Sequence, residues 1–339
     1  MNSKGKIGIT STVPSEVVYS AGYVPVDLNN LFISSDDPLG LTESAESNGI
    51  PRNYCAWIKG IYSVVHKMSG LSAVVGMTQG DCSSNYALIE NFISENIPVI
   101  TFSYPLNRDI EDLEREIKRF CDRLDTDIER AEDVRLRFNK TIRAKLAELD
   151  RLTWQEDKAS GLENHKWLVA SSDLNGDPER FDSMLSETLT EISSRQPRPP
   201  EIRLAYMGVP PVFSNIYDFL DEQRARVVYN EVQHQFSMPY EADSLASQYL
   251  EYTYPYGILT RLKRIIEESR KRRVEGIIHY VQSFCFHQLE DPVVRVSTDL
   301  PVLRIEGDKP GRLDSRTKVR IEAFLETLRE KGKRGVKDV

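Results

Sequence analysis

A repeated ten-residue pattern constrains the fold of this chain more than any other feature. "AVVGMTQGDC", residues 73–82, and "GIIHYVQSFC", residues 276–285, both begin with an apolar run and end in cysteine, with glutamine three places earlier. Counting 15 residues on from each cysteine reaches "IPVITF" at Ile97 and "LPVLRI" at Leu300. Short apolar runs separated by a helix-length segment are typical of parallel strands joined by a helix. The pattern therefore predicts an internal duplication of a strand, cysteine, helix, strand unit.

The remaining elements extend this prediction to the whole chain. Residues 1–106 alternate apolar strands with helices, interrupted by an expected loop rich in Ser, Asp and Gly at 34–51, and residues 201–339 repeat the alternation. Between them, residues 107–200 are helical and highly charged and end in the proline-rich "RQPRPP". Such alternation places helices on both faces of a parallel sheet. We predict an α/β fold of two tandem Rossmann-like or flavodoxin-like domains, joined through a charged helical insert and linker.

Composition narrows the class of protein. The chain has 339 residues, is 40% hydrophobic and 28% charged, and carries a formal charge of −8. The negative charge argues against a nucleic-acid partner, because that affinity comes mainly from Lys and Arg on phosphates. No apolar run approaches the roughly 20 residues that cross a bilayer, and "MNSKGKIGIT" lacks the apolar segment of a signal peptide. We expect a cytoplasmic protein without a membrane partner.

Four cysteines in such a chain do not indicate a disulfide framework. Cys121 lies in a charged amphipathic segment, on the same helical face as five apolar residues: Ile110, Leu113, Ile117, Phe120 and Leu124. There a cysteine behaves as a small apolar side chain. We therefore interpret Cys121 as a core residue.

The other three cysteines occupy different positions. Cys82 and Cys285 each follow a strand and open a helix, and Cys55 in "PRNYCAWIKG" lies near another helix start. Ligands of open parallel sheets bind beyond the carboxyl ends of the strands, and the partial positive charge of a helix start favours a thiolate. Three thiols facing one cleft suit either zinc or an iron–sulfur cluster. The spacing alone leaves that choice open, because no CxxC pair is present.

Polar residues beside the strand ends are further candidates for the site. Ser11, Thr12 and Glu16 either face the cleft with a catalytic role or cap the helix that follows them. Gln79 and Gln282, which precede the cysteines in both repeats, either donate hydrogen bonds to a cofactor or substrate or satisfy loop backbone groups.

The histidines show no metal-ligand spacing. His287, two residues after Cys285, is the candidate for tuning a metal centre or donating a proton, with a surface or supporting role as the alternative. The other four are expected to lie on a helix, in the charged segment, in a polar loop and in a buried strand: His66, His165, His234 and His279.

Several longer motifs carry a family resemblance over nearly the whole chain. They are "VPSEVVYSAGYVPVDL", "YCAWIKG", "GDCSSNY", "GIIHYVQSFC", "LPVLRIEGD" and "KVRIEAFLETL". With these motifs the chain resembles the 2-hydroxyacyl-CoA dehydratase D-component family, which includes subunits of 2-hydroxyglutaryl-CoA and phenyllactyl-CoA dehydratases and related subunits of ATP-dependent benzoyl-CoA reductases. The resemblance implies one 4Fe-4S cluster in the chain, held by Cys55, Cys82 and Cys285, with Cys121 outside the ligand set.

The resemblance also implies a mechanism and partners. In this family a separate ATP-hydrolysing iron–sulfur activator supplies one electron, the acyl-CoA thioester becomes a ketyl radical anion, and the 2-hydroxyl group leaves. The present chain resembles the recipient of that electron, because it contains no G-x-x-x-x-G-K-[ST] loop. The implied partners are the activator, an acyl-CoA substrate, and a homologous second subunit or a second copy.

Several hypotheses remain from the sequence. The chain is a dehydrating subunit of hydro-lyase type, a subunit of a benzoyl-CoA-reductase-like enzyme, or a non-catalytic electron-relay or paired subunit. A structural zinc protein is the alternative outside the family.

Overall fold

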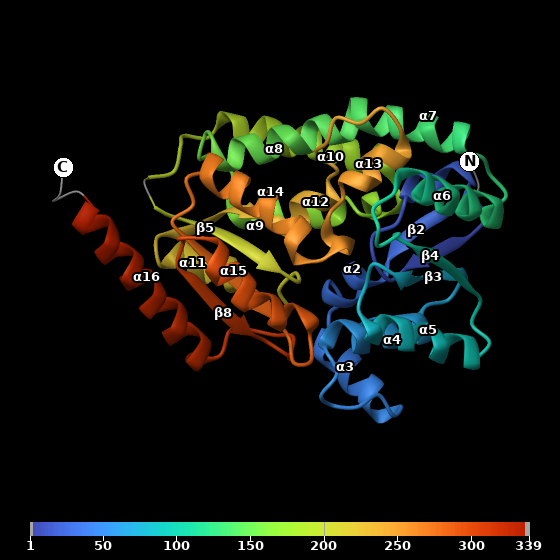
Figure 1. Ribbon diagram of the computed structural model, residues 1–339, viewed down its shortest axis with the longest axis horizontal. Helices are drawn as coiled ribbons and strands as arrows, with labels where there is room; N and C mark the ends of the chain where they lie inside the picture. The colour runs from blue at the N-terminus through green and yellow to red at the C-terminus, as the bar shows by residue number, and fades with distance from the viewer. Residues whose placement is uncertain (1–2, 200, 336–339) are drawn as a thin grey trace.

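The computed structural model describes residues 3–199 and 201–335. Two four-stranded sheets, in which all neighbouring strands run parallel, form its framework (Figure 1). Their orders, β2-β1-β3-β4 and β6-β5-β7-β8, are the same when the strands are counted from the start of each half. The strands are β1 (Lys6–Ile9), β2 (Val24–Asp27), β3 (Leu71–Gln79), β4 (Val99–Ser103), β5 (Ile202–Gly208), β6 (Ala225–Asn230), β7 (Gly276–Val281) and β8 (Val302–Glu306). The predicted two-domain α/β fold is confirmed.

Helices cover both faces of the first sheet. Val74 of β3 packs in one hydrophobic cluster with the side chains of α2, α4 and α5, whereas its neighbour Val75 packs in another with α1 and α6 (Ile110–Leu124). This alternation follows from the pleat, which points successive side chains to opposite faces. The helices of this half are α1 (Ser15–Ser20), α2 (Leu28–Ile33), α3 (Pro38–Ser47), α4 (Ala56–Lys67) and α5 (Ser83–Ser94).

The charged middle segment packs on both halves of the molecule. α6 contacts β4 and α13 (Leu245–Glu251), whereas α8 and α9 contact β6. Figure 1 shows α7, α8 and α10 running along one side of the molecule, above both sheets. The elements are α6 (Ile110–Leu124), α7 (Ile128–Phe138), the π-helical turn η1 (Asn139–Arg143), α8 (Ala144–Trp154), α9 (Gly161–Ala170), η2 (Leu174–Gly176) and α10 (Pro178–Ser194). A separate helical insert is therefore not confirmed. The domain boundaries after residues 106 and 200 stay predictions. Residues 1–2, 200 and 336–339 of these predicted domains lie outside the described residues.

The second half repeats the order of the first with additional short helices. They lie between β6 and α14, where a polar loop was expected at His234: α12 (Glu231–Phe236), which contains His234, and α13 (Leu245–Glu251). Buried polar side chains such as Gln235 and Gln248 hide the amphipathic pattern of these helices. The remaining helices are α11 (Ile216–Glu222), η3 (Tyr254–Tyr256), α14 (Ile258–Lys271), η4 (Phe286–Glu290), α15 (Asp291–Ser297) and α16 (Ser315–Gly335).

The prediction of a loop at residues 34–51 is wrong in part, because the helix α3 occupies residues 38–47. Asp37 accepts a hydrogen bond from the N–H of Gly40 and Pro38 occupies the first turn, so the start has both an N-cap and the rigid φ of proline. Leu41 and Ala45 are then buried on one face. The many Ser and Gly residues indicated a loop, because the stability of this helix comes from its N-cap and from tertiary burial.

The core runs without interruption from one half to the other. One hydrophobic cluster contains Phe32 of α2 and Val74 of β3 together with Tyr206 of β5 and Ile278 of β7. Burial of this shared apolar surface holds the two sheets in a fixed relation. Segments that leave the carboxyl ends of β1, β3 and β7 consequently meet between the halves.

Candidate functional site

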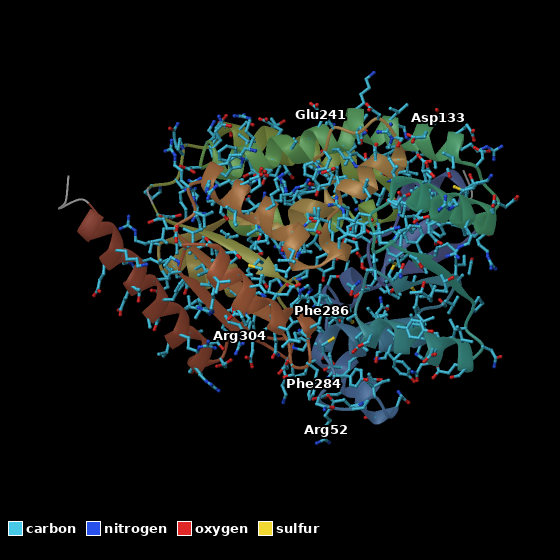
Figure 2. All side chains as sticks on the ribbon, in the orientation of Figure 1. Arg52, Asp133, Glu241, Phe284, Phe286 and Arg304 are labelled. Atoms are coloured by element: carbon cyan, nitrogen blue, oxygen red, sulfur yellow. The ribbon has the colours of Figure 1, made fainter. Side chains whose placement is uncertain are left out.

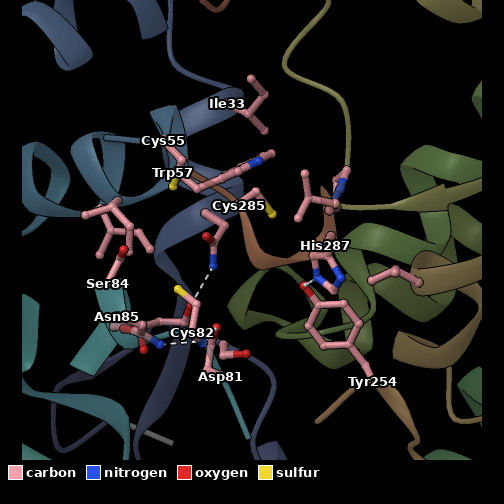
Figure 3. Close-up of a pocket in the computed structure, with 18 of the residues that line it drawn as sticks. Ile33, Cys55, Trp57, Asp81, Cys82, Ser84, Asn85, Tyr254, Cys285 and His287 are labelled. Carbon is pink, nitrogen blue, oxygen red and sulfur yellow. Dashed lines mark hydrogen bonds between the residues drawn. The ribbon is translucent and has the colours of Figure 1, made fainter. Parts of the chain in front are cut away.

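A cavity of about 460 Å³ lies where these segments meet. Its walls come from the residues that follow β1, β3 and β7 and from α2 and the start of α4. Cys55, Cys82 and Cys285 all line it, and Figure 3 shows them around the same space. Cys121 does not line the cavity; it lies on α6, buried in the cluster that also contains side chains of α1 and β3. The structure thus brings together the three cysteines that the sequence singled out.

Each of these cysteines occupies the N-cap position of a helical segment. Cys55 precedes α4, Cys82 precedes α5, and Cys285 precedes the short 3-10 helix η4. Burial nevertheless raises the pKa of the Cys55 thiol to about 12 and raises the pKa of both other thiols. Burial therefore raises the pKa of these thiols more than the backbone N–H groups of the helix starts lower it.

The turn before Cys82 requires a glycine. Gly80 has φ of +92°, and a Cβ there would lie 2.8 Å from the Cβ of Pro255 and 2.9 Å from the Cβ of Tyr104. A side chain would therefore push the thiol-bearing turn away from residues of both halves. In the second repeat the left-handed residue is Phe284, with φ of +58°.

The two repeated glutamines have different environments. Gln282 is 1% exposed, and its Oε1 accepts a hydrogen bond of 2.7 Å from the backbone N–H of Ala56, at the start of α4. This bond joins the loop of Cys285 to the helix of Cys55. Gln79 is exposed and does not line the cavity. Its side chain makes no hydrogen bond within residues 3–199 and 201–335.

His287 is buried in a network of charged groups beside the cavity. Its Nδ1 lies 2.7 Å from Glu290 Oε2, and its Nε2 lies 3.2 Å from the hydroxyl of Tyr254. Since the carboxylate accepts the proton on Nδ1, Nε2 is left to accept from Tyr254. Arg261, which is fully buried, pairs with Glu290 and Glu231. Burial lowers the pKa of His287 and the charge of Arg261 adds to this effect, whereas the hydrogen bond to Glu290 opposes it.

Ser11 and Thr12 line the cavity, whereas Glu16 does not. α1 begins at Ser15 without a side-chain cap, so the alternative in which these residues cap the helix is wrong. Glu16 is 0% exposed and accepts hydrogen bonds from Tyr249 (2.7 Å), Gln248 (3.2 Å) and Arg143. These contacts tie α1 to α13 and η1, outside the cavity.

Sequence reasoning missed Asp81, which lines the cavity immediately before Cys82. Its two carboxylate oxygens accept from the N–H of Cys82 at 2.6 Å and from Nδ2 of Asn85 at 2.7 Å. Burial raises the pKa of Asp81, although these hydrogen bonds oppose the rise. The only signal was the Asp in "GDC", which has Phe284 as its counterpart in the second repeat.

Trp57 and His165 also line the cavity and were not predicted. The indole N–H of Trp57 is buried without a hydrogen-bond partner among the described residues. Figure 3 shows its ring extending into the cavity beside Cys55 and Cys285. His165 comes from α9 in the charged middle segment, and nothing in its local sequence indicated that this helix would reach the site.

Three thiols on the walls of one cavity are a donor set of the kind that metal centres use. Among the described residues, no three His, Cys, Asp or Glu side chains converge closely enough to hold one metal ion. A cluster of four irons takes each cysteine at a separate iron, so three thiols on different walls of one cavity are compatible with it. Backbone N–H groups of the first turns, at Ile58 for Cys55 and Asn85 for Cys82, oppose the rise in thiol pKa and would serve sulfur ligands in the same way.

These features define an α/β protein with two similar sheets and a cavity lined by three thiols between them. A family model described as 2-hydroxyglutaryl-CoA dehydratase, D-component, matches residues 10–328. The chain therefore belongs to this family of dehydratase components, as its motifs predicted. A comparison with curated proteins found no match. In the part of the chain that the structure describes, no helix is long and apolar enough to cross a membrane.

Proposed function

We propose that this chain is the cluster-carrying subunit of an enzyme that dehydrates a 2-hydroxyacyl-CoA thioester. The observation that carries the proposal is the meeting of Cys55, Cys82 and Cys285, from three separate helix starts, on the walls of one cavity. Membership of the dehydratase family supports a hydro-lyase reaction of this class.

The three cysteines would hold a 4Fe-4S cluster, with one iron left without a protein ligand. When bound, such a cluster supplies one-electron chemistry and an open Lewis-acid site for a substrate oxygen. The electron would come from a separate ATP-hydrolysing iron–sulfur protein, since the chain contains no P-loop motif of its own. A homologous subunit or a second copy would complete the enzyme.

The chain's own residues would bind the thioester and handle protons around it. The unpartnered indole N–H of Trp57 would donate a hydrogen bond to an oxygen of the acyl group. Tyr254 and His287, joined at 3.2 Å, form a hydrogen-bonded pair on the cavity wall that would hold or pass a proton. Apolar side chains such as Ile58 and Phe236 would exclude water from the acyl chain.

The cluster is tested by purifying the protein without oxygen and measuring iron, acid-labile sulfide and the EPR spectrum after reduction. We expect Cys55→Ala, Cys82→Ala and Cys285→Ala each to lower the iron content, and Cys121→Ala, the matched control, to retain it. A colourless protein with one zinc per chain contradicts the proposal, as does equal iron loss in Cys121→Ala.

The catalytic role is tested by adding 2-hydroxyacyl-CoA thioesters to the reduced protein. A change in the EPR signal supports substrate binding at the cluster, because a new ligand at an iron alters its electronic environment. An unchanged signal across several acyl chains favours the electron-relay subunit instead.

A further inference from the structure

The walls of the cavity around the three thiols are unlike those of a site for an anion. In the part of the chain that the structure describes, no Lys or Arg side chain lines this cavity, whereas Asp27 and Asp81 do. The hydroxyl of Ser172 donates to Asp27 at 2.6 Å. The side-chain amide of Asn85 donates to Asp81 at 2.7 Å. Proteins usually hold a carboxylate with Arg or Lys, so the cavity lacks the group that would receive a carboxylate of an acyl chain.

Basic residues close to the wall are directed elsewhere. Arg52 precedes the wall residue Asn53, but its side chain is 92% exposed and lies at the outer edge of the molecule (Figure 2). Arg261, which is fully buried, pairs with Glu231 at 2.7 Å and with Glu290 at 3.0 Å. Turning Arg261 toward the cavity would leave these buried carboxylates unpaired, which is strongly unfavourable. Neither cation is therefore available to a ligand inside the cavity.

The two histidines of the wall do not supply the missing charge. Burial lowers the pKa of His165 to about 3, so its ring is uncharged at neutral pH. That ring stacks on Tyr217, with 4.9 Å between the two centroids. His287 already has a partner at each ring nitrogen, Glu290 at 2.7 Å and Tyr254 at 3.2 Å. These walls therefore offer hydrogen-bond donors to a ligand without a free positive charge.

Apolar side chains face the cavity from several helices. Ile58 of α4 and Val232 of α12 are 5% and 1% exposed, and both line it. Ile33 of α2, Val169 of α9 and Phe236 of α12 line it as well. An apolar acyl chain gains free energy by leaving water for such a surface. A carboxylate placed there loses its hydration without a compensating partner.

We propose that this cavity selects 2-hydroxyacyl thioesters whose acyl side chain is uncharged and mainly apolar, and that it rejects a dicarboxylic acyl group. The inference rests on the proposed function, in which the acyl group enters the cavity. It narrows that function, because the matching family model is described by 2-hydroxyglutaryl-CoA, whose acyl group ends in a second carboxylate. The distinction arises from the missing cation and from the apolar walls.

The test compares three CoA thioesters of matched acyl length by titration calorimetry on the anaerobically purified, unreduced protein. They are 2-hydroxyglutaryl-CoA, its terminal carboxamide, and the branched apolar 2-hydroxy-5-methylhexanoyl-CoA. Since all three share the CoA group, differences in their dissociation constants report on the acyl side chain alone. The apolar thioester is expected to bind about 100-fold more tightly than 2-hydroxyglutaryl-CoA, with the carboxamide between them. Equal or tighter binding of 2-hydroxyglutaryl-CoA overturns the proposal.

A variant that adds the missing cation tests the cause of this preference. Ile33→Arg places a guanidinium on the cavity wall and should tighten 2-hydroxyglutaryl-CoA binding about 10-fold while weakening that of the apolar thioester. Leu31→Arg on the same helix is the matched control, because Leu31 is 40% exposed and does not line the cavity. Val169→Arg repeats the test from α9 if Ile33→Arg does not fold. Unchanged 2-hydroxyglutaryl-CoA affinity in folded Arg variants of the wall overturns the proposal.

The outcomes separate this inference from the proposed function. Tighter binding of the dicarboxylic thioester overturns the selectivity but leaves acyl-CoA binding in place. No measurable binding of any of the three thioesters contradicts the proposed function and the inference together. Iron content is measured on the same samples, and iron-free protein that keeps the expected order of affinities would contradict the cluster and retain the selectivity.

Discussion

The hydrogen bond from the backbone N–H of Ala56 to Gln282 should contribute measurably to stability. The repeated motif supplies a control, because Gln79 occupies the equivalent position in the first repeat. Both residues are buried, at 0% and 1% exposure, and the bond is 2.7 Å long. Gln282→Met keeps the length of the side chain but removes the acceptor, which leaves a buried N–H without a partner. The penalty for such an orphaned donor is about 1–3 kcal/mol, and methionine's similar volume keeps the packing loss small.

The control is Gln79→Met, the same substitution at the equivalent position of the first repeat. Because Gln79 is exposed, its replacement should change the free energy of unfolding by less than about 0.5 kcal/mol. The two variants therefore share their chemistry and their place in the motif but differ in burial.

Two measurements check the prediction. Urea denaturation should show a lower midpoint for Gln282→Met than for Gln79→Met, and the amide of Ala56 should exchange its hydrogen faster only in Gln282→Met. If the cluster proposal holds, iron should also be lost more readily from Gln282→Met, because the Cys55 helix is no longer tied to the Cys285 loop. Equal midpoints together with unchanged exchange at Ala56 would refute the reasoning.

Three further perturbations have expected outcomes. Trp57→Phe should weaken the binding of an acyl-CoA by about 1–2 kcal/mol, measured by calorimetry, whereas Trp167→Phe should not; equal affinities would remove the proposed donor. Glu16→Gln should lower stability by about 3 kcal/mol in urea denaturation, because it weakens a buried ion pair, and activity lost at unchanged stability would instead point to a catalytic role. Burial, and then the charge of Asp27, raises the pKa of Asp173 to about 7. The folded chain therefore keeps a proton that the unfolded chain releases, and stability should fall as pH rises from about 4 to 7. Asp173→Asn should flatten that decline, and an identical pH profile would contradict this assignment.

Local patterns predicted the framework because they reflect requirements that act over a few residues. The apolar runs that became β3 and β7 are buried between helices, and such strands are recognisable without knowledge of their partners. Cys121 could be assigned to a helix face from spacing alone, and it is 1% exposed there. By contrast, α3 was expected to be a loop, since its Ser-rich sequence forms a helix only with the Asp37 cap and a buried face.

The difference between Gln79 and Gln282 shows what a local sequence pattern cannot predict. Both occupy the same place in a repeated motif, yet only Gln282 meets a backbone donor of the other half. Sequence reasoning missed three cavity residues for a related reason. Each is carried by a different element, and only the packing of these elements brings them to one cavity: Asp81, Trp57 and His165.

The sequence by itself determined the α/β class, the duplication and the identity of the three thiols, because hydrophobic periodicity and the position of a residue after a strand are properties of short segments. The tertiary structure decided the rest. In the folded chain, Cys55, Cys82 and Cys285 line one cavity, and the middle helices pack on both sheets. Glu16 lies outside that cavity and pairs with Arg143. These outcomes depend on contacts between residues that are more than a hundred positions apart in the sequence, and they are set by burial and hydrogen bonding that exist only in the folded chain.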